Sequence, residues 1–388
     1  MFAYFRRVIY GDIQSIILMS NVITIFLCGD VMTGRGVDQV LPYSNDPRIY
    51  EPYLKNARKY VMIAEQENGP LPDSIGFDYV WGDALGIFDR LNPDLKIINL
   101  ETAITISDDH WKGKRINYRM HSKNIPVLTS AGIDFCSLAN NHVLDWGYDG
   151  LRETLRILNE AGVRHAGAGE NRTEAQHPAT FSVGDKEKLH VFSYGTRHSG
   201  ISSDWAAGED QPGVNLLKNF SRDVIESVRE NIQNHPEPDD IVIVSVHWGG
   251  NWCYEIPKEH RKFAHQLIDE MGVDIVHGHS SHHPKGIEVH NNKLILYGCG
   301  DFINDYEGIG GYEQFRDDLG VMYFPEVDPA SGDLVRLQMI PTRIEKFQVH
   351  RASREDAAWL KEMFDREGNR LGTRTELTED DRLMLRWE

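Results

Sequence analysis

The 388-residue sequence predicts an α/β protein. Short runs of β-branched residues alternate with stretches that have helical apolar spacing, and this alternation is typical of βαβ units. Several of these runs end in Asp, Asn, Glu or His, and open α/β sheets bind ligands at the carboxyl ends of their strands. Hydrophobic residues make up 40% of the chain and charged residues 26%, a globular composition that excludes collagen-like and disordered proteins.

Seven segments are predicted as strands, because each is a short apolar run bounded by polar residues or glycine. The first runs into Cys28-Gly29-Asp30, the second into Asn99-Leu100-Glu101, and the third into Asn140-Asn141-His142. Two later ones run into His247 and His279. The predicted strands cover residues 22–27, 95–98, 134–138, 190–194, 241–246, 274–276 and 294–297.

Helices are predicted between these strands. Leu151, Leu155 and Leu158 share one helical face, and Ser353 is a good N-cap for the last helix. Residues 317–341 are predicted as antiparallel strands with a turn at 328–332. The last twenty residues are expected to form a polar, loosely attached tail. The predicted helices cover residues 150–161, 221–231, 257–271 and 353–366.

The chain is expected to form one large domain, because no repeat or low-complexity linker interrupts it. Residues 1–18 have mixed polarity and lack the apolar core of a signal peptide, and Met19 precedes the first strand as a natural start would. We therefore predict a non-core extension at 1–18, a domain at 20–348, and a C-terminal helix and tail at 349–388.

Charge and cysteine content narrow the classes of function. The net charge of −18 disfavours binding to nucleic acid and to anionic membranes. No segment approaches the ~20 apolar residues that a membrane span requires. The four cysteines lie far apart, without a CxxC pair, which favours a reducing compartment and a cytoplasmic location.

Histidines carry the strongest functional signal. Eight of the 17 histidines fall between His247 and His290, and four of them lie in residues 277–283. They could be surface residues, but their position after predicted strands favours a metal site. Imidazoles combined with Asp30, Glu101 and Asn141 suit two hard or borderline cations. The lack of cysteine in this set favours a hydrolytic site over a structural zinc site.

The order of the motifs resembles the capsule-synthesis CapA family, the poly-γ-glutamate biosynthesis CapA-like proteins. The resemblance covers about residues 22–305. This family is similar to calcineurin-type metallophosphoesterases, which implies a four-layer α/β/β/α sandwich of two mixed sheets with a dinuclear metal centre at the sheet edges. The matching segments are 29–32 with Arg35, 99–101, 137–142 with Asp145 and Gly147, 247–249, 278–284 and 300–302.

The resemblance also implies roles for single residues. His142 would be the general acid and Asp145 would orient its ring. Arg35 and Arg119 are candidates for binding substrate anions, and exposed salt bridges are the alternative for both. Met32 stands where the metallophosphoesterase motif has another ligand, so the number of metals and their identity (Mn²⁺, Zn²⁺ or Fe²⁺) stay open. The implied metal ligands are Asp30, Glu101, Asn141, His247, His279 and His282.

Two functions compete at this stage. The first is a metal-dependent hydrolase that acts on a phosphoester or a γ-glutamyl amide, in a small molecule or a polymer. The second is a non-catalytic accessory protein that binds capsule polymer or a synthase partner. A binding module has no need for six metal-type side chains at strand ends, which favours the hydrolase. The sequence does not distinguish a monomer from an oligomer.

Overall fold

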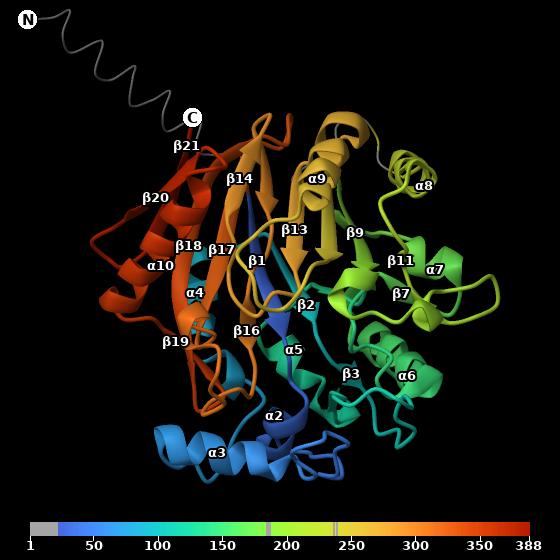
Figure 1. Ribbon diagram of the computed structural model, residues 1–388, viewed down its shortest axis with the longest axis vertical. Coiled ribbons are helices and arrows are strands. Elements are labelled where there is room, and N and C mark those ends of the chain that lie inside the picture. Colours follow the sequence, from blue (N-terminus) through green and yellow to red (C-terminus); the bar gives the residue numbers. More distant parts are fainter. Residues whose placement is uncertain (1–21, 184–187, 236, 238–239) are drawn as a thin grey trace, which may run out of the picture.

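The computed structural model describes residues 22–183, 188–235, 237 and 240–388, and it shows a mixed α/β protein (Figure 1). The extension predicted at residues 1–18 lies outside the described residues. All seven predicted strands and all four predicted helices are confirmed, with small shifts at their ends. The antiparallel pair with its turn near residues 328–332 is confirmed as well.

Ten strands form the larger sheet: β1 (Ile23–Val31), β2 (Leu95–Leu100), β5 (Phe135–Ser137), β6 (Arg164–Ala166), β16 (Asp301–Ile303), β17 (Leu319–Val327), β18 (Leu334–Glu345), β19 (Gln348–Arg351), β20 (Thr373–Leu377) and β21 (Leu383–Trp387). The main order is β20-β21-β18-β17-β1-β2-β5-β6, with β16 paired to β1 and β19 to β18. Strands β1, β2, β5 and β6 are parallel, whereas β17 and β18 are antiparallel. The parallel half directs the ends of β1, β2 and β5 to one edge.

Seven strands form the smaller sheet: β8 (Ala179–Ser182), β9 (Lys188–Thr196), β11 (Leu216–Leu217), β12 (Ile241–His247), β13 (Ile275–His279), β14 (Ile287–His290) and β15 (Lys293–Leu296). The main order is β11-β9-β12-β13-β15-β14, and β8 pairs with β9. Its central strands are parallel, so β12 and β13 also end at a common edge. Two short pairs complete the strands: β3 (Ala103–Ile104) with β4 (Arg119–Met120), and β7 (Ala168–Gly169) with β10 (Gly213–Val214).

Nine α-helices surround the sheets in the described part of the chain. None of them is long and apolar enough to cross a membrane. The Ser353 side chain caps the last helix by accepting a hydrogen bond from the backbone N–H of Asp356. The helices are α2 (Arg35–Val40), α3 (Arg58–Asn68), α4 (Asp83–Leu91), α5 (Pro126–Ser130), α6 (Gly147–Glu160), α7 (Arg172–Gln176), α8 (Arg222–Gln233), α9 (Lys258–Met271) and α10 (Arg354–Gly368).

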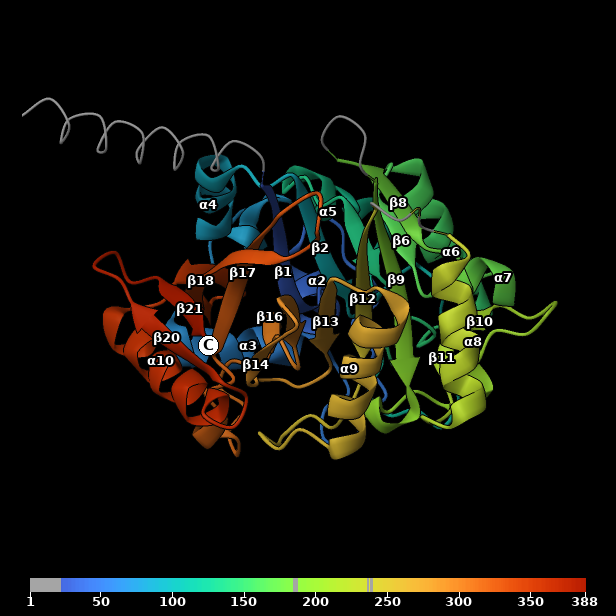
Figure 2. The same cartoon turned by 90° about the horizontal axis from the view of Figure 1, so that it is seen from above.

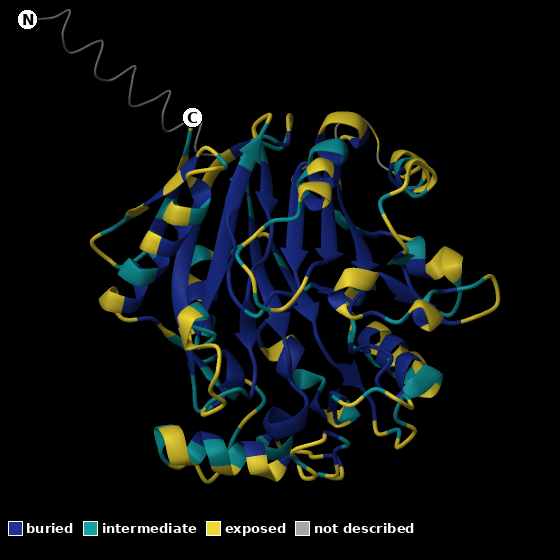
Figure 3. Cartoon of the chain, viewed as in Figure 1, coloured by how far each residue is buried: buried dark blue, intermediate teal, exposed yellow. Residues whose placement is uncertain are grey.

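The two sheets bury apolar residues against each other. Strand β12 shows the alternation: Ile241 and Ile243 join a cluster with residues of β1 and β2, whereas Val242 and Val244 pack against α8 and α9. Helices α4, α5 and α6 cover the opposite face of the larger sheet (Figure 2). The strands are accordingly buried, and exposed residues concentrate on helices and loops (Figure 3).

The prediction that the last twenty residues form a polar, loosely attached tail is wrong. Strands β20 and β21 form a hairpin, and β21 adds to the edge of β18 through the pairs Gln338–Met384 and Met339–Leu383. Leu383 and Leu385 are both buried, one residue apart on the same face of the strand. The apolar alternation, Leu383, Leu385 and Trp387, is short. Its partner strand β18 is more than forty residues away, so the local pattern did not show what the segment packs against.

Leu385→Ala should lower the free energy of unfolding by about 2–4 kcal/mol, because it leaves a cavity under the hairpin. Urea denaturation followed by far-UV circular dichroism measures the change. Arg386→Ala is the control, since this neighbour is exposed and forms only a surface salt bridge with Glu376, which should cost below about 1 kcal/mol. Equal stability of the two variants would show that the hairpin does not pack.

Candidate metal centre

The strand ends of both sheets meet at one cavity of about 310 Å³. Asp30 lies near the end of β1, Glu101 follows β2, and Asn141 follows β5. His247 ends β12 and stands opposite His279, the last residue of β13, in the parallel register. The residues of the larger sheet and of the smaller sheet therefore face the same space. The cavity is lined by Asp30, Met32, Glu101, Lys114, Arg115, Ile116, Tyr118, Asn141, His142, His247, Asn251, Ser280, His282, Asp301 and Tyr306.

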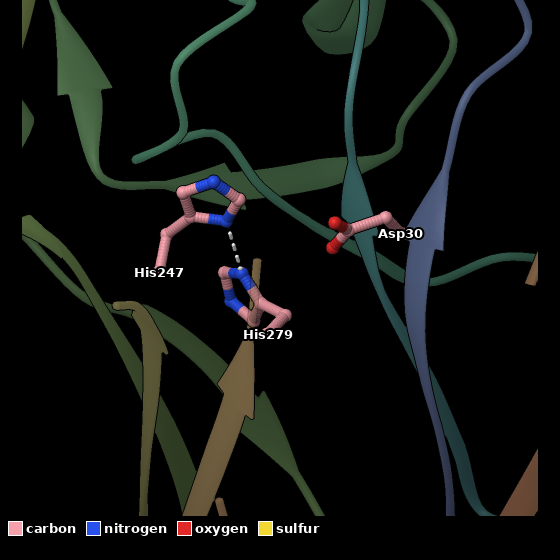
Figure 4. A group of neighbouring side chains, drawn as sticks. All are labelled: Asp30, His247 and His279. Carbon is pink, nitrogen blue, oxygen red and sulfur yellow. Dashed lines mark hydrogen bonds between the residues drawn. The ribbon is translucent and has the colours of Figure 1, made fainter. Parts of the chain in front are cut away.

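His247 and His279 form the innermost pair of the site. Their Nδ1 atoms lie 2.8 Å apart, and the Asp30 carboxylate lies beside them (Figure 4). One ligand atom from each of these three residues lies within 4.8 Å of the other two. His247 Nε2 is 3.1 Å from Asn141 Oδ1, which can only accept, so the neutral ring keeps a lone pair at Nδ1. Burial lowers the pKa of both histidines, which favours the neutral, ligating form.

Three buried carboxylates share the cavity: Asp30, Glu101 and Asp301. Burial and the neighbouring Asp301 raise the pKa of Asp30 to about 7, and burial together with Asp30 raises the pKa of Glu101. The Asn99 amide donates to Asp30 at 2.7 Å and to Glu101 at 2.6 Å. These groups repel one another, and a divalent cation among them would remove the repulsion.

Asp301 is a residue to which sequence reasoning assigned no role. It stands opposite Asp30 where β16 pairs with β1. Its oxygens lie 3.0 Å and 2.9 Å from His282 Nδ1, and Asn304 donates to one of them at 2.9 Å. Burial acts to lower the pKa of His282, but the carboxylates of Asp301 and Asp30 raise it on balance. The signal was present, because Gly300-Asp301 follows a strand as Gly29-Asp30 does.

His142 and Asp145 form a second pair at the rim of the metal-type residues. His142 Nδ1 lies 2.6 Å from Asp145 Oδ2, and the Lys114 ammonium also contacts the Asp145 carboxylate. The other ring nitrogen, Nε2, lies 4.0 Å from Glu101 Oε1, and the Tyr118 ring stacks on the imidazole at 3.9 Å. Burial and the Lys114 charge lower the pKa of His142 to about 4. The neutral ring donates its Nδ1–H to Asp145 and keeps Nε2 as the basic atom.

Arg35 and Arg119 were candidates for binding substrate anions, with salt bridges as the alternative, and neither lines the cavity. The Arg35 guanidinium is buried and pairs with Glu51 at 2.8 Å and with Asp305. Arg119 lies over the Trp146 ring at 3.7 Å and pairs with Asp108 at 3.0 Å. Both charges are used to hold loops together, so the structure gives no support to a substrate-binding role.

The fold and the site together define a class: a mixed α/β protein with buried histidines, carboxylates and an amide gathered at the strand ends of two sheets. The family model of the bacterial capsule synthesis protein PGA_cap matches residues 24–306, and the chain belongs to this family. The resemblance to CapA-like proteins is thereby confirmed.

Curated relatives carry related names. The probable polyglutamine synthesis accessory protein of Mycobacterium tuberculosis (strain CDC 1551 / Oshkosh) is 44% identical over 365 residues, which cover 94% of this chain and 96% of the relative. The capsule biosynthesis protein CapA of Bacillus anthracis is 24% identical, over 87% of this chain and 75% of the relative. The PGA biosynthesis protein CapA of Bacillus subtilis (strain 168) is 26% identical, over 78% and 68%.

Asp30→Asn should stabilise the metal-free protein at pH 8, on the order of 2–4 kcal/mol, and less at pH 5. The pKa of Asp30 rises from 3.8 to about 7 on folding, so the folded state binds this proton more tightly. The stability from this group is present below about pH 4 and is lost as the pH rises through about 7. Denaturant titrations in EDTA at both pH values measure the difference. Asp73→Asn, at an exposed position, is the control; a destabilised Asp30→Asn at pH 8 would contradict the expected repulsion.

Proposed function

We propose that this chain is a metal-dependent hydrolase with a metallophosphoesterase-type site, acting on a phosphoester or a γ-glutamyl amide in poly-γ-glutamate or capsule metabolism. The observation that carries the proposal is the gathering of donor side chains from both sheets: six of the seven line one cavity, and the seventh, His279, lies against His247. Helices pack on the outer face of the larger sheet, the two sheets pack on each other, and further helices pack on the outer face of the smaller sheet. This order supports the four-layer sandwich of metallophosphoesterases. The names of the relatives support the link to capsule and PGA biosynthesis.

The donor set fits divalent cations. Carboxylate and amide oxygens combined with neutral imidazoles suit Mn²⁺, Zn²⁺ or Fe²⁺, and two cations would neutralise the repulsion among the three carboxylates. When bound, such cations act as Lewis acids on the substrate and lower the pKa of water. The residues that would hold them are Asp30, Glu101, Asn141, His247, His279, His282 and Asp301.

His142 is the residue proposed to move the proton. Asp145 holds the Nδ1–H, so only Nε2 exchanges a proton with groups in the cavity. The neutral ring then keeps a lone pair at Nε2, which would take a proton from the attacking water and give a proton to the leaving group. Both an alkoxide and an amine leaving group need that proton. Asp145 and the stacked Tyr118 ring act through His142 by keeping its orientation.

A non-catalytic accessory function is the second candidate. It is favoured by one observation, the name of the Mycobacterium tuberculosis relative as a probable polyglutamine synthesis accessory protein. In that case the chain would bind polymer or a synthase partner. The buried donor set speaks for the hydrolase, because a binding surface gains nothing from three carboxylates that repel one another in a cavity.

His142→Asn should keep the metal content close to that of the wild type and lower turnover by roughly 10²–10⁴-fold, the usual effect of removing a general acid or base. His279→Asn is the matched variant and should lose metal, since it removes an inner ligand. Metal analysis of protein purified without chelator, and a panel of phosphoester and γ-glutamyl amide substrates, measure both effects. If His142→Asn also loses its metal, His142 is a ligand. If metal-loaded wild type turns over no substrate in the panel, the accessory function is favoured.

A further inference from the structure

The cavity has a cationic side as well as an acidic one. The strand ends of the two sheets contribute the carboxylates and imidazoles, whereas the loop between β3 and β4 contributes Lys114, Arg115 and Ile116. Two positive charges therefore line the cavity from one short segment. Lys114 and Arg115 differ in their contacts with other side chains of the protein, and these contacts decide which of the two is available to a ligand.

The charge of Lys114 is used within the protein. Its ammonium contacts the Asp145 carboxylate and the Asn141 carbonyl oxygen, and it lies 3.1 Å from His142 Nδ1. It is therefore part of the structure that orients His142. Its charge is paired with the Asp145 carboxylate, and two of its three N–H groups are directed at Asp145 and Asn141 rather than at the open part of the cavity.

The charge of Arg115 is unused. The side chain is exposed at the cavity, and it forms no salt bridge with any carboxylate among the described residues. Arg35 and Arg119, by contrast, each pair with a carboxylate of the protein. A guanidinium presents parallel N–H donors that match the two oxygens of a carboxylate or phosphate.

The backbone around Arg115 is held in place relative to His142. Trp111 N–H donates to the Asp145 carbonyl oxygen at 2.7 Å, and Tyr118 N–H donates to the Asp145 carboxylate at 2.6 Å. The loop is thus tied on both sides of Arg115 to the residue that orients His142. These two hydrogen bonds attach the loop that carries Arg115 to the residue that orients His142, and Arg115 itself lines the cavity beside His142.

We propose that Arg115 forms an oxyanion subsite, which binds a carboxylate or phosphate group of the substrate while the scissile bond lies at the metal-type residues. This inference rests on the proposed function, and it names the residue that receives the anionic group of that substrate. A γ-glutamyl chain would supply an α-carboxylate, and a phosphoester would supply its phosphate. Arg115 thereby offsets the repulsion that an acidic protein exerts on an acidic substrate.

The test compares Arg115→Gln with Lys112→Gln, a matched control. Lys112 is an exposed cation of the same loop that does not line the cavity and lies 3.7 Å from Asp109. Isothermal titration calorimetry measures the binding of inorganic phosphate and of a γ-linked glutamate trimer, each to Mn²⁺-loaded and to EDTA-treated protein. Arg115→Gln should lower the affinity for the anion that binds at the subsite by roughly 10- to 100-fold, as expected for the loss of a charge-assisted pair. Lys112→Gln should bind as the wild type does.

The outcomes separate this inference from the proposed function. Loss of phosphate affinity indicates a phosphoester substrate, and loss of trimer affinity indicates the glutamate polymer. If Arg115→Gln binds both anions as tightly as Lys112→Gln, or if the wild type binds neither anion, the subsite is overturned. Metal analysis of the same samples is the separate test of the proposed function, because a wild type that takes up no metal refutes the metal site while the EDTA-treated titrations still report on Arg115.

Discussion

Repulsion among buried carboxylates is the constraint on which the site depends. Asp30 and Asp301 stand opposite each other in register, and Glu101 shares their cavity. Asn99 places one amide between Asp30 and Glu101, and Asn140 in turn donates to the Asn99 oxygen at 3.0 Å, which orients that amide. The protein thus supplies neutral hydrogen-bond donors to the carboxylates, while the remaining charge is left to be compensated in the cavity.

The backbone must come unusually close for these carboxylates to meet. A Cβ atom on Gly29 would lie 1.7 Å from the Gly300 carbonyl oxygen, so only glycine fits at this position. This close approach allows Asp30 N–H to donate to Gly300 at 3.0 Å, which begins the pairing of β1 with β16. Glycine at position 29 is therefore a requirement of the site, and the same strand contact stabilises the centre of the larger sheet.

The long-range contacts explain why candidate residues of similar type have different fates. Arg35 and Asp305 are 270 residues apart in sequence, yet their side chains form a buried salt bridge. Arg35 forms a second buried salt bridge with Glu51. Arg115 lies close in sequence to Arg119 but at the cavity, without such a pair. Charge type and sequence position did not distinguish these three arginines, because the distinction depends on which carboxylates folding brings next to each one.

The sequence by itself determined the α/β class, four of the nine described helices and the strands with polar ends, since apolar periodicity and capping are local properties. It also indicated that Asp30, Glu101, Asn141, His247, His279 and His282 would lie together, because parallel strands end at a common edge. Only the tertiary structure decided that Asp301 joins them, that Arg35 and Arg119 are used elsewhere, and that the last residues form a hairpin on β18. Each of these depends on pairing between segments far apart in the chain, and no local pattern encodes the partner.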